Sequence, residues 1–343
     1  MALAGRHSTI LQRYPVDMDD RVHQTPTLAA SIRSATDDDL LPAAQVYQAA
    51  ARSLHERLRA IDPIGSDASC KRDLDAAVRA LTDLLRRRNG AVIVADVHGD
   101  LAGVGAIRIH DQHAHIAFLF VLPSFQGQGL GRHLLEHLAN FASDAGAETI
   151  SLIASRDPRA WQRYLRLGLR PGPPILSLRA MNPNFPAEAP DRSLSMEPLS
   201  PDSSAHLDVI DALDLDVRGS RRRHDVESWL RGGDTGALLL DADAGSTIGY
   251  VIIGQEPDHV RIGPIVSRTV DRFGDVLAHA LHMAGRLGGA TRHPWRVDLP
   301  ASNHIAIAPL LEAGFIVTAL QPWFATGEIG HWDRYIFRNE DEL

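Results

Sequence analysis

The chain has 343 residues, and at about 150 residues per domain this length suggests two globular domains. The formal net charge of −8 argues against a nucleic-acid partner, because nucleic-acid-binding proteins usually carry a basic excess. Charges or glycines interrupt every apolar run, so we expect neither a membrane-spanning helix nor a secretory signal. The single cysteine, Cys70, excludes an intramolecular disulfide and favours a cytoplasmic protein.

The order of the chain predicts a tail, two domains and a linker. Residues 1–27 mix polar residues, prolines and charges without periodicity, which is typical of a flexible N-terminal tail. A first domain follows over 28–182. Three prolines within eight residues disfavour regular pairing after it, so we place a linker at 183–192 and a second domain at 193–343.

In the first domain the sequence predicts an α/β fold. The apolar run at 116–122 is hydrophobic on both faces, as a central strand should be. Strands are expected near 91–96, 101–110, 114–122, 148–154 and 174–180, and helices near 37–50, 70–88, 129–145 and 157–167. This order predicts a mixed sheet covered by helices.

The second domain repeats features of the first. Residues 31–38 and 195–202 are each a short extended stretch followed by a hydroxyl N-cap and an acidic first turn. Later in each domain a helix ends at a C-cap glycine, Gly168 or Gly314, and passes into a strand. A duplicated domain with insertions and deletions explains both similarities.

A glycine-rich loop joins strand 114–122 to the next helix. Its three alternating glycines, Gly127, Gly129 and Gly131, allow the backbone to approach a ligand with its N–H groups unpaired. Those N–H groups and the positive helix end favour an anion such as a phosphate. A tight strand-to-helix turn without a ligand is the structural alternative.

Two common phosphate-binding loops do not fit this segment. A Walker loop ends in Gly-Lys-Ser/Thr, whereas Arg132 and His133 follow the last glycine. A dinucleotide-binding fingerprint needs G-x-G-x-x-G early in a βαβ unit, but here the pattern is G-x-G-x-G after several strands.

The segment Val121–Gly131 instead resembles the acetyl-CoA loop of GNAT acyltransferases. The family pattern is Gln/Arg-x-x-Gly-x-Gly/Ala, and Gln126, Gly129 and Gly131 match its fixed positions. The resemblance continues through strand 149–154 and the following helix, and it covers about residues 31–182.

The resemblance implies a fold, a co-substrate and a binding site. It implies two tandem GNAT-like domains, each with a mixed, mostly antiparallel central sheet flanked by helices, and it implies acetyl-CoA as co-substrate. It further implies that backbone groups of Leu119 and Val121 pair with the pantetheine arm and the acetyl group. The CoA pyrophosphate would lie in a cradle made by Gln126, Gly127, Gln128, Gly129, Leu130, Gly131 and Arg132.

Tyr164 lies where the family places its general acid. A tyrosine of pKa near 10 that protonates a thiolate of pKa near 8.5 works uphill by about 2 kcal/mol, and by less if the site lowers the tyrosine pKa. The alternative role for Tyr164 is to pack its helix onto the sheet.

His115 is the candidate general base. It precedes Val121 by six positions on one strand, so both side chains should point the same way. Some GNAT enzymes carry a carboxylate base at the corresponding place, and a histidine can do this work near neutral pH. Only His113 shares a face with His115, and zinc sites normally need three or four convergent ligands, so we expect no metal.

The second copy lacks most of the loop and the acid. Thr269, Val270 and Arg272 stand opposite Gln126 and the first two glycines, and Leu310 stands opposite Tyr164. We therefore expect a degenerate copy that serves as scaffold or acceptor wall, and one CoA per chain. The arginines of that segment argue the other way, because arginines can hold phosphates without glycines.

The leading interpretation is an N-acetyltransferase that transfers an acetyl group from acetyl-CoA directly to a primary amine through a tetrahedral intermediate. The alternative is an acyl-CoA-binding regulatory or interaction protein without turnover. The acceptor is a small molecule or a peptide, and its identity stays open. A preference for another acyl-CoA and the choice between monomer and homodimer also stay open.

Overall fold

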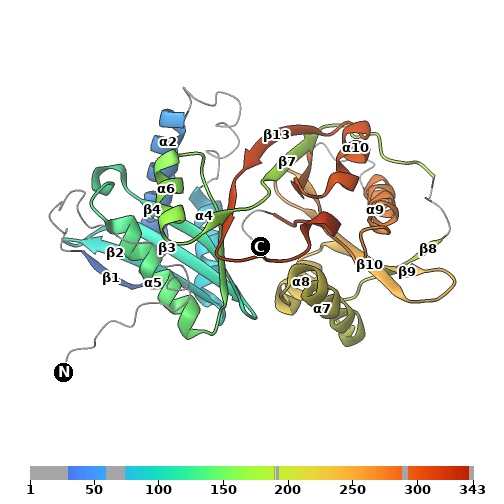
Figure 1. The fold of residues 1–343 in the computed structure, drawn as a ribbon, viewed down its shortest axis with the longest axis horizontal. Coiled ribbons are helices and arrows are strands. Elements are labelled where there is room, and N and C mark those ends of the chain that lie inside the picture. The colour runs from blue at the N-terminus through green and yellow to red at the C-terminus, as the bar shows by residue number, and fades with distance from the viewer. Residues whose placement is uncertain (1–29, 59–73, 189, 191–192, 288–292, 340–343) are drawn as a thin grey trace. The chain divides into compact units, whose positions relative to one another are not determined.

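The structure is a computed structural model that describes residues 30–58, 74–188, 190, 193–287 and 293–339 (Figure 1). The predicted tail at 1–27 and the first residues of the helix expected at 70–88, with Cys70, lie outside the described residues. No helix in the described part is long and apolar enough to cross a membrane.

The chain divides into two compact units. The first comprises Met1–Gly172 with Pro322–Glu328, and the second comprises Pro173–Gln321 with Ile329–Leu343. Each unit therefore contains a short segment that residues of the other unit separate from its main part.

The first unit is built on a sheet of seven described strands in the order β1-β2-β3-β4-β5-β14-β6. Its strands are β1 (Ser31–Ser34), β2 (Gly90–Val97), β3 (Asp100–His110), β4 (His113–Val121), β5 (Thr149–Ile153), β6 (Arg170–Pro171) and β14 (Trp323–Ala325). Its helices are α2 (Leu40–Leu58), α4 (Leu74–Arg86), α5 (Leu130–Asp144) and α6 (Pro158–Arg166), with 3-10 turns η1 (Asp37–Asp39) and η2 (Pro123–Phe125). The pairing is antiparallel except between β4 and β5.

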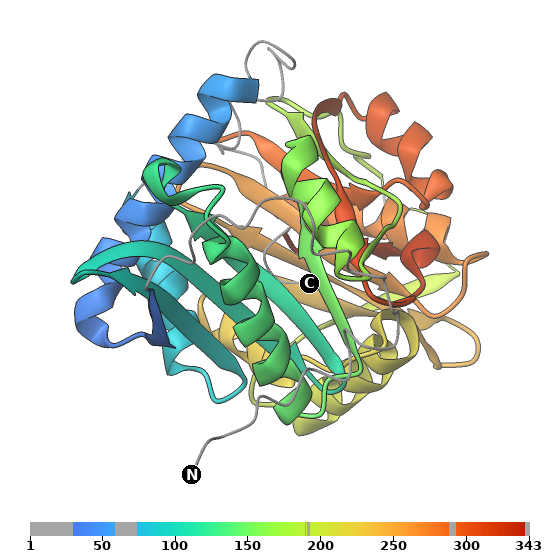
Figure 2. The same ribbon diagram turned by 60° about the vertical axis from the view of Figure 1, so that its left-hand side comes forward.

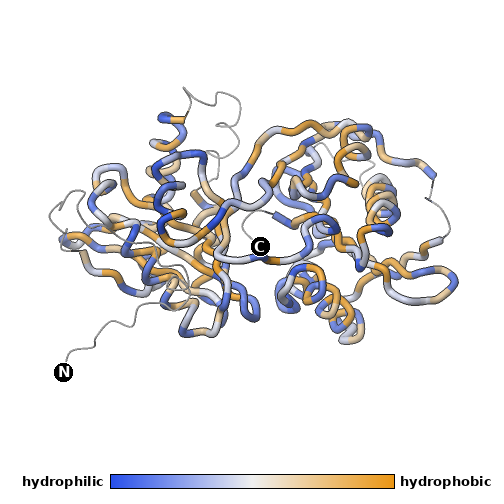
Figure 3. The backbone as a smooth tube through the Cα atoms, in the orientation of Figure 1, coloured by the Kyte–Doolittle hydropathy of each residue, from blue (hydrophilic) through white to orange (hydrophobic). Residues whose placement is uncertain are grey.

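Helices cover both faces of this sheet (Figures 1 and 2). The apolar side of α5 packs on one face, around Leu134 and Leu138, while α2 and α4 pack on the other, around Val46 and Leu81. The hydrophobic residues run along the central strands between these layers (Figure 3). The apolar side chains of the strands and of the helices therefore pack together in one hydrophobic core on each face of the sheet.

The second unit repeats this arrangement, with the strand order β8-β9-β10-β11-β12-β7-β13. Its strands are β7 (Ile175–Ala180), β8 (Leu194–Pro198), β9 (Thr235–Asp241), β10 (Thr247–Gln255), β11 (Val260–Ser267), β12 (Trp295–Pro300), β13 (Ile316–Gln321) and β15 (Tyr335–Ile336). Its helices are α7 (Ser204–Arg218), α8 (Arg223–Arg231), α9 (Phe273–Leu287) and α10 (His304–Glu312), with the 3-10 turn η3 (Trp332–Arg334). The predicted pair of similar α/β domains is confirmed.

The two sheets exchange one strand each. β14 lies between β5 and β6 in the first sheet, and β7 lies between β12 and β13 in the second. From the sequence we place the strand expected near 174–180 in the first domain, whereas it pairs in the second sheet. Periodicity reports that a strand exists but not which strand it pairs with. The pairing is decided by contacts such as the hydrogen bond from Ser177 Oγ to Asp298 Oδ1, at 2.7 Å.

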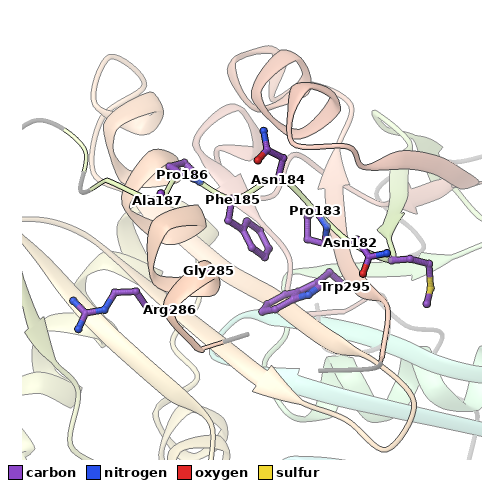
Figure 4. Close-up of a pocket in the computed structure, with 10 residues that line it drawn as sticks. Asn182, Pro183, Asn184, Phe185, Pro186, Ala187, Gly285, Arg286 and Trp295 are labelled. Atoms are coloured by element: carbon purple, nitrogen blue, oxygen red, sulfur yellow. The ribbon is translucent and has the colours of Figure 1, made fainter. Parts of the chain in front are cut away.

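The proline-rich segment after β7 is anchored to the second unit. Figure 4 shows Phe185 pointing toward Trp295, and the two rings meet edge to face with centroids 4.8 Å apart. The Asn184 N–H donates to the Ala313 carbonyl at 2.8 Å. Gly285 of α9 leaves room for this segment, since a Cβ there would lie 2.9 Å from the Cβ of Phe185.

The seating of β14 gives a test of the exchanged strand. A Cβ at Gly172 would overlap the ring of Trp323, and the Gly172 N–H donates to the Trp323 carbonyl at 2.9 Å. We expect Gly172→Ala to lower the free energy of unfolding by about 1–3 kcal/mol through overpacking, measured by urea denaturation. Gly274→Ala in α9 is the control, because its nearest neighbour atom would be 3.6 Å away. Equal stability of the two variants would contradict this seating of β14.

Candidate functional site

The glycine loop ends in a row of unused backbone donors. Gly127 and Gly129 have φ of +81° and +84°, a conformation that favours glycine. The first backbone bonds of α5 run from Arg132 and His133 to the Gly129 carbonyl. Within the described residues, the N–H groups of residues 127–131 donate to no backbone carbonyl. They therefore leave free donors at a helix start, an arrangement that can bind an anion.

The Gln126 side chain ties the loop to the preceding strand. Its Nε2 donates to the carbonyl of Val121 at 2.9 Å. The Gln128 Nε2 donates to the carbonyl of Ser124 at 3.1 Å. These side chains hold the shape of the loop, which leaves the backbone of the loop to meet a ligand.

The sequence pattern does not single out the arginine that lies at this helix start. A Cβ at Gly131 would lie 3.0 Å from Nη1 of Arg163, a residue of α6. Arg132, by contrast, is exposed, and its Nε lies 3.6 Å from Glu136 Oε1, one turn further along α5. The abundance of arginine in the chain masked Arg163, and only the packing of α6 brings it to the loop.

The sheet opens between β4 and β5. These parallel strands pair over four rungs and separate after Ile116 and Leu152, while β4 continues to Val121. On its other side, β4 stays paired with β3 as far as Val121. On its β5 side, the segment 117–121, which includes Leu119, therefore has no strand partner, and its backbone groups there face the gap between the two strands.

A β-bulge at Ala117 changes which way the β4 side chains point. Ile107 of β3 pairs with Ile116, whereas the preceding Ala106 pairs with Phe118. The extra residue shifts the in-and-out alternation of β4 by one position. Expectations that count positions along β4 across this point therefore fail.

His115 and Val121 consequently point to opposite faces, so the prediction of a shared direction is wrong. Ile116 and Val121 both belong to the cluster on the α5 face. His115 adjoins Ile116 and so faces the other way, toward α2 and α4. Its neighbour across the strands is Arg108, which lies 3.6 Å from Asp83 of α4.

His115 is buried in a polar network. It is 1% exposed, and its Nδ1 lies 2.9 Å from Ser151 Oγ. His113 lies two residues earlier on the same face of β4, with Nε2 3.0 Å from the same hydroxyl and Nδ1 3.0 Å from Thr149 Oγ1. Within the described residues, no group of three or more His, Cys, Asp or Glu side chains could hold a metal ion.

Tyr164 lies on the α5 face, in the same cluster as Leu119 and Val121. Its helix α6 begins at Asp157, whose side chain accepts from the Arg159 N–H at 3.0 Å. Burial raises the pKa of Tyr164 to about 12. The tyrosine pKa therefore moves away from that of a thiol, and protonation of a free thiolate is uphill by about 5 kcal/mol.

The two catalytic candidates thus lie on opposite faces of the sheet. The structure brings Tyr164, Leu119, Val121 and the start of α5 together on one face. It places His115 on the other face, at the closed end of the gap.

The second unit has the same gap, but its own chain fills it. β11 and β12 pair only at Val260–Trp295 and Arg261–Arg296. β15 then pairs with β11, and on the other side the Phe337 N–H donates to the Asp298 carbonyl of β12 at 3.0 Å.

The residues opposite the glycine loop also have partners. Arg268 Nε donates to the Thr247 carbonyl at 3.1 Å. Arg272 lies 3.0 Å from Asp275 and 3.5 Å from Asp241. Both arginines that could have held phosphates are therefore engaged within the unit.

Comparison with known proteins agrees with this geometry. Residues 50–169 match the acetyltransferase (GNAT) family, whereas no curated protein matches the chain. A putative acetyltransferase from Pyrococcus horikoshii is similar in fold, with a TM-score of 0.64 and 16% identity over 92% of this chain and 96% of that one. A GCN5-related N-acetyltransferase from Sphaerobacter thermophilus has a TM-score of 0.59 and 16% identity over 86% of this chain and 95% of that one. A tandem GNAT protein from the clavulanic acid biosynthesis pathway has a TM-score of 0.55 and 14% identity over 87% of this chain and 99% of that one.

At these identities the solved structures show the fold alone, and the family match lies in the N-terminal part of the chain. Residues 50–169 therefore match the GNAT acetyltransferase family, and the chain carries two GNAT-like folds in tandem.

Proposed function

We propose that the first unit transfers an acetyl group from acetyl-CoA to a primary amine. Acyl transfer from acyl-CoA is the general activity of the GNAT family, and the choice of acetyl group and amine is our inference. The observation that carries the proposal is the combination of an open β4–β5 gap with an unpaired helix start beside it. The acceptor is a small-molecule or peptide amine.

The CoA pyrophosphate would bind at the loop from Gln126 to Arg132. The N–H groups of 127–131 would donate to its oxygens, and the helix end would add a favourable dipole. Arg163 would supply the positive charge, because its guanidinium already lies at this helix start. The pantetheine arm would pair with backbone groups of Leu119 and Val121 in the gap.

Arg163 gives a direct test of CoA binding. Arg163→Met should weaken CoA binding by about tenfold or more, since a charge-assisted hydrogen bond contributes about 1.5–3 kcal/mol. Arg132→Met is the matched control, and its smaller effect follows from the pairing of Arg132 with Glu136. Calorimetric titration with CoA measures both. An Arg163→Met protein that binds CoA as wild type does would contradict the assignment.

The chemistry would take place in the gap. His115 would accept the proton of the amine, whose nitrogen then attacks the acetyl carbonyl, and backbone N–H groups of 117–121 would stabilise the oxyanion. Tyr164 would protonate the departing thiol. With a pKa of about 12, the phenol stays protonated at neutral pH and well above it.

Tyr164→Phe tests this step because it keeps the ring and removes the proton donor. We expect kcat to fall on the order of 10²-fold with CoA affinity nearly unchanged. In wild type, the raised pKa means that Tyr164 loses its proton only at higher pH than an ordinary tyrosine. Deprotonation of Tyr164 should therefore cause no fall in kcat below about pH 10. Release of thiol from acetyl-CoA across an amine library measures both. Unaltered turnover in the variant, with product release shown to be fast, would return Tyr164 to a packing role.

The second unit should not bind CoA. β15 fills the gap that would receive pantetheine, and Arg268 and Arg272 have partners within the unit. Titration should therefore give one CoA per chain. A stoichiometry near two, with the second site surviving Gly129→Val, would show that the second unit is a working copy.

A further inference from the structure

Four polar side chains line up on one face of the β4–β5 pair. The strands are parallel and in register, with His113 beside Thr149 and His115 beside Ser151. Residues two apart on a strand share a face, so two histidines and two hydroxyls form a ladder on that face. The ladder begins at His115, next to the last paired rung before the gap opens.

The four groups are connected by distances that suit hydrogen bonds. Along the ladder, His115 Nδ1 to Ser151 Oγ is 2.9 Å, Ser151 Oγ to His113 Nε2 is 3.0 Å, and His113 Nδ1 to Thr149 Oγ1 is 3.0 Å. His115 and Ser151 are buried, at 1% and 0% exposed, whereas Thr149 at the far end is partly exposed. The chain of polar atoms thus runs from the closed end of the gap toward solvent.

The charges around the ladder disfavour a cation that stays on His115. Arg108 of β3 pairs with His115 across the strands and keeps its positive charge at any working pH. Its partner Asp83 of α4, 3.6 Å away, also binds Arg87 at 2.6 Å. His110 of β3 lies opposite His113. An imidazolium at His115 would therefore lie beside a permanent cation, which favours passing the proton onward.

We propose that His115, Ser151, His113 and Thr149 form a proton relay that carries the amine proton from the gap to solvent. The proposal rests on the proposed acetyl transfer. His115 Nε2 takes the proton from the amine, and its Nδ1 proton passes to Ser151. The hydroxyl proton of Ser151 passes to Nε2 of His113, whose Nδ1 proton leaves through the Thr149 hydroxyl to water.

The bonds and charges of the transfer balance with this relay. The amine nitrogen forms the new C–N bond as the C–S bond breaks. The thiolate takes the proton of Tyr164, and the second proton lost by the nitrogen restores the Tyr164 phenol. An ammonium acceptor and acetyl-CoA thereby give an amide, free CoA and one proton released to solvent. Ser151 and His113 are positioning and relay residues, since they act on the amine only through His115.

Ser151→Ala tests the relay with two probe acceptors, propylamine and hydrazine. An alkylamine of pKa near 10 is almost fully protonated and needs a base, whereas hydrazine is a much weaker base that loses its proton easily. We expect kcat with propylamine to fall about tenfold, less than the 10²–10⁴-fold loss typical of a missing base. The rate with hydrazine and the affinity for CoA should stay near wild type.

Two further variants keep the test decisive. Ser177→Ala in β7 is the matched control, because Ser177 is also buried on a strand and hydrogen-bonded, to Asp298, but lies in the second unit. Thr149→Val removes the exit hydroxyl at a partly exposed position, so it tests the relay even if Ser151→Ala folds poorly.

The outcomes separate the relay from the proposed function. If wild type consumes acetyl-CoA with neither amine, the proposed function fails. If wild type turns over and the relay variants slow propylamine and hydrazine equally, or slow neither, the relay is wrong and the four groups only hold the sheet together. A selective loss with propylamine in Ser151→Ala and Thr149→Val, absent in Ser177→Ala, supports the relay.

Discussion

The separation of β4 from β5 after the Ile116–Leu152 rung is the constraint on which the candidate site depends. A sheet that opens in its middle leaves backbone groups unpaired, and such groups need partners. In the first unit these groups face the gap into which we place the pantetheine arm. The bulge at Ala117 lies at the start of the opening and turns the last part of β4. Because of the bulge, Leu119 and Val121 lie on the same face as Tyr164, whereas His115 lies on the other face.

The second unit meets the same constraint without a ligand. Its gap between β11 and β12 receives β15, and Asn303 Nδ2 donates to the Tyr335 carbonyl at 3.1 Å. Arg261 holds the strand further along, by donating to the Arg338 carbonyl at 2.8 Å. The two units therefore differ in how they satisfy one backbone requirement. The second unit thus differs from the first by a filled gap as well as by its changed loop residues.

The exchanged strands give the C-terminal half of the chain a part in the first unit. Phe324 of β14 is fully buried, and its ring lies 5.3 Å from Trp161 and 5.7 Å from Tyr164 between centroids. The same strand is tied to β5, where the Ile150 N–H donates to Thr326 Oγ1 at 2.9 Å. Part of the wall that buries the candidate acid, and so raises its pKa, thus comes from residues that lie between two segments of the second unit in the sequence.

The sequence by itself determined the local elements, the duplicated fold and the glycine loop, because periodicity, caps and glycine spacing are local signals. It also identified Tyr164 and His115 as candidates, through their places on those elements. Only the tertiary structure decided the direction of His115, since a bulge is set by pairing with β3. The same holds for Arg163 at the loop, for the exchange of β7 and β14, and for β15 in the second gap. Each of these depends on which distant segments pair or pack, and a pattern along the chain carries no record of its partner.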